Sequence, residues 1–87
     1  MFDLHWTDES ETHIARHGVK PEEVEQATER PFHTMTGQKG ATLLSGRTHE
    51  GRYLLVVLAE SGDARWYVVT ARDMTGPERR VYQKKAQ

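Results

Sequence analysis

Apolar positions in the first third of the chain recur at helical spacing. Thr7 followed by two acidic residues is a typical helix start and Gly18 is a typical stop, so we predict a helix over residues 8–17. Pro21 followed by two glutamates begins a second segment that the next proline must end. This predicts a second, short helix over about residues 21–29.

From Phe32 onward the apolar positions alternate with a period of two, which is typical of strands. Three turn signals that contain glycine divide this region into four segments. The predicted strands are roughly 32–36, 41–48, 52–60 and 64–72. Connections this short make the strands antiparallel neighbours in a meander. The third strand is apolar on both faces and therefore belongs in the middle of the sheet.

A last helix is predicted from the capping box Thr75-Gly76-Pro77-Glu78, whose threonine and glutamate satisfy backbone N–H groups at a helix start. Residues 2–6 leave room for a short leading strand. The fold class is therefore α+β in one domain over residues 1–87, with two N-terminal helices, a four-stranded antiparallel meander and a C-terminal helix. We expect one core, which the strands and both N-terminal helices share. It contains Ile14, Val24, Leu43, Leu55, Val57, Trp66 and Val68.

Composition narrows the protein class. The 87 residues contain no cysteine, which removes disulfides and thiolate chemistry and fits a reducing compartment. The chain start lacks the features of a signal peptide, and the longest apolar run is too short to cross a bilayer. We therefore expect a soluble cytoplasmic protein that does not contact membranes.

The charge is distributed unevenly along the chain. The formal net charge is −1, which gives no global attraction to nucleic acid. Residues 1–30 hold eight acidic and three basic side chains, whereas residues 64–87 hold two acidic and six basic ones. The basic C-terminal third is a candidate anion site, and ordinary surface charge that keeps a small domain soluble is the alternative.

An ordered set of short motifs runs along nearly the whole chain. In chain order these are Trp6-Thr7-Asp8, Arg16-His17-Gly18-Val19, Pro21-Glu22-Glu23-Val24, Gly46, Arg52-Tyr53-Leu54-Leu55-Val56-Val57, Val69-Thr70-Ala71-Arg72 and Glu78-Arg79-Arg80-Val81-Tyr82. In this order and at about this spacing, the set resembles the BrnT-like toxins of bacterial type II toxin–antitoxin systems, which are related to RelE ribonucleases. The resemblance implies a RelE-like fold, RNA cleavage without a metal or other cofactor, and neutralisation by a co-encoded antitoxin of the BrnA kind.

Metal-free RNA cleavage needs a base for the 2′-hydroxyl, cations beside the phosphorane-like transition state and an acid for the leaving oxygen. Arg72 ends the fourth predicted strand, and its planar guanidinium suits a phosphate. The alternative is a structural arginine that holds the last helix through a carboxylate such as Glu78. Arg79 and Tyr82 lie three apart on one helix face, where they are candidates to act together. The alternative for Tyr82 is packing on the sheet.

Two further candidates lie outside this group. Arg52, at the start of the central strand, is a third phosphate-binding candidate besides Arg72 and Arg79, and a plain exposed charge is its alternative. His17 titrates near neutral pH and is the candidate general acid or base, with a helix-capping role as its alternative. His13 and His17 have the spacing of metal ligands, but no third ligand follows in a recognised pattern, so we expect no metal site.

Two functions from different classes remain open. The first is a ribonuclease toxin whose partners are RNA and a BrnA-like antitoxin. The second is a RelE-like protein that has lost catalysis and acts as a protein-binding or autoregulatory partner. The sequence does not distinguish a homodimer from a toxin–antitoxin hetero-oligomer.

Overall fold

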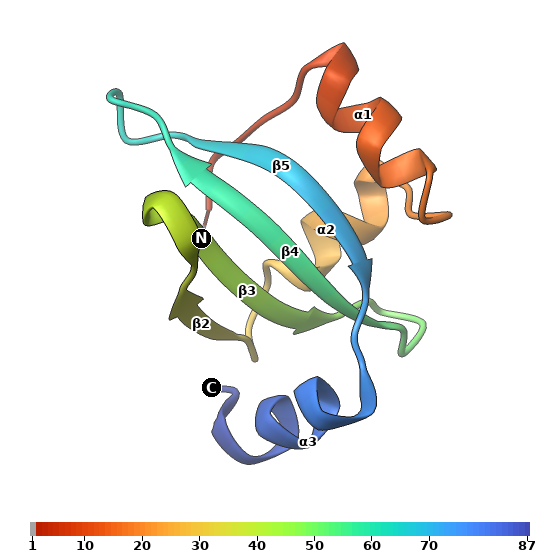
Figure 1. Cartoon of the computed structure of the whole chain (residues 1–87). Coiled ribbons are helices and arrows are strands. Elements are labelled where there is room, and N and C mark those ends of the chain that lie inside the picture. Colours follow the sequence, from red (N-terminus) through yellow and green to blue (C-terminus); the bar gives the residue numbers. More distant parts are fainter. Residues whose placement is uncertain (1) are drawn as a thin grey trace.

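The computed structural model describes residues 2–87 and has three α-helices and a five-stranded sheet over that range (Figure 1). The elements in chain order are β1 (Leu4–His5), α1 (Asp8–Ala15), α2 (Pro21–Ala27), β2 (His33–Thr36), a 3₁₀ turn (Gln38–Gly40), β3 (Thr42–Arg47), β4 (Tyr53–Glu60), β5 (Trp66–Asp73) and α3 (Gly76–Lys85). The predicted α+β class and the order of the elements are confirmed. In residues 2–87, no helix is long and apolar enough to cross a membrane.

The sheet has the strand order β1-β5-β4-β3-β2. Strands β2 to β5 form the predicted antiparallel meander, with β4 in the middle. The leading strand is present as β1, which pairs in parallel with β5 at the sheet edge through Leu4 and Trp66. The count is therefore five strands rather than four, because the N-terminal segment returns to the edge that β5 leaves free.

Both N-terminal helices are two residues shorter than predicted. Helix α1 ends at Ala15 because the N–H of His17 bonds the Ile14 carbonyl in a tighter turn, and Gly18 then adopts a left-handed φ of 68°. Helix α2 can sit closely on the sheet because Gly46 of β3 has no side chain. A Cβ atom at that position would lie 1.9 Å from the Ala27 carbonyl oxygen.

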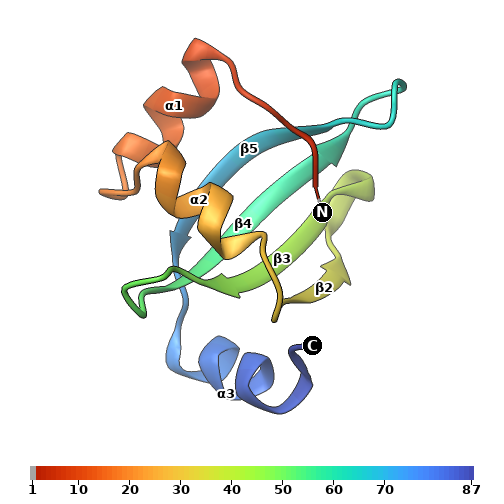
Figure 2. The ribbon, with the colours of Figure 1, turned by 180° about the vertical axis from the view of Figure 1, so that it is seen from behind.

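The two faces of the sheet are covered differently. Figure 2 shows α1 and α2 lying over one face, and the larger core lies between them and the sheet. Its fully buried members include Ile14, Val24, Leu44, Leu54, Val56, Leu58 and Ala71. Helix α3 lies at one end of the opposite face, where a smaller cluster joins Leu55, Met74 and Tyr82.

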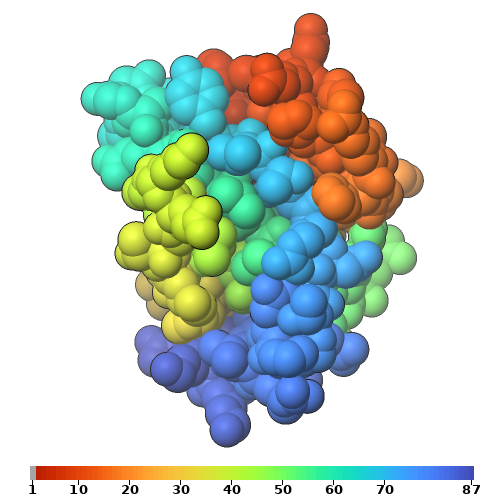
Figure 3. Space-filling model, viewed as in Figure 1, coloured from red at the N-terminus to blue at the C-terminus, as the bar shows by residue number. Residues whose placement is uncertain are grey.

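The expectation of one shared core is wrong, because the sheet has a separate cluster on each face. Val68 and Trp66 join Ile14 and Val24 as expected, but Leu55 is buried on the opposite face. Leu43 and Val57 are only half-buried, because α3 covers one end of their face and leaves the rest open. Figure 3 shows this face, with sheet atoms visible between the orange α1 and the blue α3.

Neighbouring leucines of β3 test this division. Leu44 faces the larger core and is 0% exposed, whereas Leu43 is half-buried on the opposite face. We predict that Leu44→Ala lowers the free energy of unfolding by about 2–5 kcal/mol, and that Leu43→Ala costs less than about 2 kcal/mol because its surroundings are already partly solvated. Urea unfolding of both variants measures this difference, and equal costs would contradict the assignment of the two faces.

Candidate nucleic-acid interface

Arg52 is held by contacts within the protein. Its Nε and Nη2 donate to the Asp73 carboxylate at 2.7 and 3.1 Å, and Nη1 donates to Glu23 at 3.2 Å. Nη1 and Nη2 also donate to the carbonyl oxygens of Gly18 and His17 at 2.8 and 3.2 Å. The five N–H groups of this guanidinium therefore all have acceptors. The hydrogen bond with Asp73 raises the pKa of Arg52 and lowers that of Asp73. This is an internal connection, a role that neither alternative from the sequence contained.

Arg72 binds Glu78, as the structural alternative to a phosphate-binding role predicted. Its Nη1 and Nη2 donate to the two carboxylate oxygens of Glu78 at 2.9 and 3.0 Å, and Nη1 also donates to the Asp73 carbonyl. The hydrogen bonds from Arg72 are the largest cause that lowers the pKa of Glu78 to about 2. The geometry favours a connection between β5 and α3 over a free phosphate ligand.

Tyr82 and His17, which were also predicted to be catalytic, differ in burial. Tyr82 is 5% exposed, and its hydroxyl donates to the Pro31 carbonyl at 3.1 Å, which favours the packing alternative. Burial raises the pKa of Tyr82. His17 is exposed at the end of α1, where its positive form contributes to the low pKa of Asp73. These contacts group His17 with Arg52 rather than with α3.

Arg79 is the predicted phosphate-binding arginine that is exposed and forms no ion pair with a carboxylate among residues 2–87. Its guanidinium lies 4.3 Å from the centre of the Tyr53 ring, and the guanidinium of Arg47 lies 5.0 Å from the same centre. A hydrogen bond with Gln83 and the positive charges of Arg47 and Arg79 lower the pKa of Tyr53. We call Arg47, Tyr53, Arg79 and Gln83 the Tyr53 cluster. The ring of Tyr82 meets Tyr53 edge-on at 5.7 Å and supports it from inside the protein.

Tyr53 and Arg47 were not found in the sequence as site residues. They are directly opposite one another in the β3–β4 register. Assigning this register from the sequence would have placed the two side chains together. Arg47 projects from the end of β3, and the lack of a side chain on Gly51 leaves room for it. A Cβ atom on Gly51 would lie 3.0 Å from an Nη atom of Arg47.

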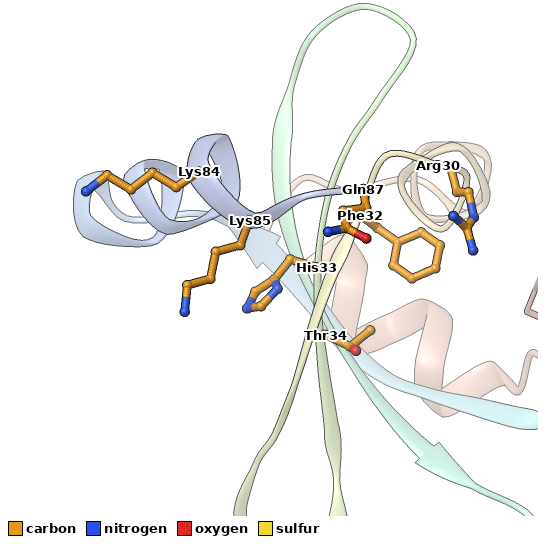
Figure 4. A pocket seen from close by; sticks show the side chains of 7 residues that line it. All are labelled: Arg30, Phe32, His33, Thr34, Lys84, Lys85 and Gln87. Carbon is orange, nitrogen blue, oxygen red and sulfur yellow. The ribbon is translucent and has the colours of Figure 1, made fainter.

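A second group of cations surrounds a cavity of about 540 Å³ beside the end of α3 (Figure 4). It is lined by Arg30, Phe32, His33, Thr34, Lys84, Lys85 and Gln87. Across residues 2–87, the exposed cations that form no ion pair with a carboxylate include Arg47, Arg79 and Arg80 near the Tyr53 cluster, and Arg30, Lys84 and Lys85 at this cavity. The end of the molecule that carries α3 can therefore bind anions at two places.

Among the described residues 2–87, no group of three or more histidine, cysteine or acidic side chains is placed to hold a metal ion. Comparison of the chain with family models, curated proteins and solved structures gives no match.

Replacement of Arg52 tests its connecting role. Lysine keeps the charge but offers three N–H groups from one atom, so it cannot reach Asp73, Glu23 and both carbonyls together. We expect Arg52→Lys to lower the free energy of unfolding by about 2 kcal/mol. Arg80→Lys, at an exposed position on α3, is the matched control and should have little effect. Urea unfolding compares the two, and similar small effects would argue against the connection.

The Arg72–Glu78 pair predicts a pH dependence of stability. Because folding lowers the pKa of Glu78 from 4.5 to about 2, its contribution is fully present above pH 4.5 and is lost as the pH falls toward 2. Thermal unfolding should therefore show a gap between the unmodified chain and Glu78→Gln that narrows over this range. Glu22→Gln, an exposed change of the same charge, should give no such gap. A gap that is constant from neutral pH to pH 2 would contradict the pairing.

Proposed function

We propose that this chain is the toxin of a type II toxin–antitoxin pair and cleaves RNA without a metal, in the manner of BrnT-like and RelE-like toxins. The observation that carries the proposal is the Tyr53 cluster, in which a phenol of lowered pKa lies against two guanidiniums at an exposed, cationic end of the protein. The ordered motifs of the sequence and the α+β order of the elements support it. A BrnA-like antitoxin is the expected protein partner.

The Tyr53 cluster contains groups suited to 2′-hydroxyl attack. Tyr53, as phenolate, takes the proton of the 2′-hydroxyl, and that oxygen then bonds to the adjacent phosphorus. Arg47 and Arg79 offset the negative charge that develops on the phosphorane oxygens. The bond between phosphorus and the 5′-oxygen breaks, and the 5′-oxygen takes a proton from solvent. The products are a 2′,3′-cyclic phosphate and a 5′-hydroxyl end.

Two residues that the sequence indicated as catalytic become positioning residues in this proposal. Arg72 binds Glu78 in the first turn of α3, directly before Arg79, and so fixes where that guanidinium projects. Tyr82 packs edge-on against Tyr53 and limits the movement of its ring. Arg52 joins α2 and β5 to the main-chain carbonyl of His17 after α1, and these contacts stabilise the fold.

The second candidate function, a protein-binding partner without catalysis, is favoured by a different observation. The open face of the sheet exposes Met35 beside an apolar hollow of about 200 Å³, which Leu43, Leu55, Pro77 and Val81 also line. Exposed apolar surface of this kind is typical of protein contacts. This alternative predicts an intact, folded protein that cleaves no RNA.

Paired tyrosine variants test the proposed chemistry. Tyr53→Phe keeps the ring and its contacts with both guanidiniums but removes the ionisable hydroxyl, so we expect RNA cleavage to fall by about 100-fold. Tyr67→Phe makes the same change at an exposed position on β5 and should leave cleavage unchanged. Cleavage of labelled RNA and the thermal midpoint are measured on each variant.

The same assay includes a chelator, which should leave cleavage by the unmodified chain intact. Full activity of Tyr53→Phe at an unchanged midpoint would remove Tyr53 from the chemistry. Activity that a chelator abolishes and a divalent metal restores would contradict the metal-independent mechanism. A folded, unmodified chain that cleaves no RNA under any of these conditions would favour the second candidate function.

A further inference from the structure

The cavity at the end of α3 is formed by two segments that are far apart in the sequence. Phe32 and Gln87 exchange two main-chain hydrogen bonds, each 3.0 Å long, and these bonds hold the end of the chain against the segment that leads into β2. Arg30, Phe32 and His33 therefore form one side of the cavity, and Lys84 and Lys85 form the other. These main-chain bonds fix the two segments relative to one another.

The charged side chains that line this cavity are all basic. Arg30, Lys84 and Lys85 are cations, and no acidic residue is among the lining residues. Figure 4 shows Lys85 and His33 pointing the same way, with Arg30 on the far side of the Phe32 ring. Cations gathered on one surface raise the local concentration of anions.

Size and shape indicate which anion fits. A volume of about 540 Å³ exceeds the need of a single phosphate and lies within the range of small-molecule sites. The ring of Phe32, with Arg30 at 5.9 Å from its centre, is a flat surface on which a base can stack. Ammonium groups of lysine bind phosphate as point charges and tolerate different geometries.

We propose that this cavity is a nucleotide-binding site, in which Lys84 and Lys85 contact the phosphate and Phe32 and His33 contact the base. The nucleotide is either free or part of an RNA strand. The second source rests on the proposed function and makes the cavity a subsite for a nucleotide that flanks the cleaved bond. Arg79 and Lys84 are separated by about 7.5 Å along the axis of α3 and by about 140° around it, so a strand that curves around the end of α3 can reach both sites.

Binding is measured with two probes, adenosine 5′-monophosphate and a fluorescein-labelled 2′-O-methyl RNA that cannot undergo 2′-hydroxyl attack. The test variant is the double change Lys84→Gln and Lys85→Gln. The matched control is Arg16→Gln with Lys39→Gln, which removes the same charge from exposed positions away from α3. Thermal midpoints establish that both variants are folded.

We expect the test variant to bind each probe that the unmodified chain binds about tenfold more weakly than the control variant does. For RNA, the slope of log K against log salt concentration should also become shallower by about 0.7 for each phosphate that the variant no longer neutralises. Amide and imidazole resonances of Phe32 and His33 should shift on titration with adenosine 5′-monophosphate if the free nucleotide binds. Shifts confined to titration with RNA assign the site to a nucleotide within a strand.

The outcomes separate this inference from the proposed function. A site that binds adenosine 5′-monophosphate, and no longer does so in the test variant, stands even if the chain cleaves no RNA. Normal RNA cleavage with equal binding of both probes by the test and control variants would overturn the site and leave the nuclease proposal intact. Failure of the folded, unmodified chain to bind either probe would also overturn the site.

Discussion

The guanidinium of Arg52 is the interaction on which the arrangement of the other elements depends. It binds two main-chain carbonyl oxygens that follow α1, the Glu23 carboxylate in the first turn of α2, and the carboxylate of Asp73, the last residue of β5. A cation at this position also suits the carbonyl end of α1. Because Asp73 directly precedes the connection to α3, the same contact sets where α3 begins. The adjacent Arg72–Glu78 pair then fixes the first turn of that helix.

The basic residues in and around α3 therefore differ in their partners. Arg52 and Arg72 are bound to carboxylates and stabilise the fold. Those at the Tyr53 cluster and at the cavity near the chain end face solvent without such partners in the described structure, residues 2–87. The first group is needed to hold the second in place, since α3 carries Arg79, Lys84 and Lys85. An arginine that looks suited to phosphate can thus contribute to function only through the helix that it anchors.

Local signals in the sequence predicted the elements well because their causes are local. The capping box at Thr75 and Glu78, the glycine stop after α1 and the turns of the meander each act within a few residues. The single core was predicted wrongly because periodicity does not say which helix covers which face. The roles of Arg52 and Arg72 depended on their final partners, and Glu23 lies 29 residues from Arg52. The cavity depends on the main-chain pairing of Phe32 with Gln87, and no local sequence pattern predicts this pairing.

The net charge of −1 does not predict whether this molecule binds anions locally. The acidic first third of the chain forms α1 and α2 on one face of the sheet, whereas the basic last third forms β5 and α3 (Figures 1 and 2). Charges in water are screened over about 8 Å at physiological ionic strength, and even the shortest extent of the molecule is 22 Å. Repulsion from most acidic residues of this first third therefore fades before it reaches α3, and Glu25 and Glu29 are the acidic residues that lie beside Arg30 and Phe32. A phosphate near α3 experiences mainly the cations beside it, so near-neutral overall charge is compatible with local binding of RNA.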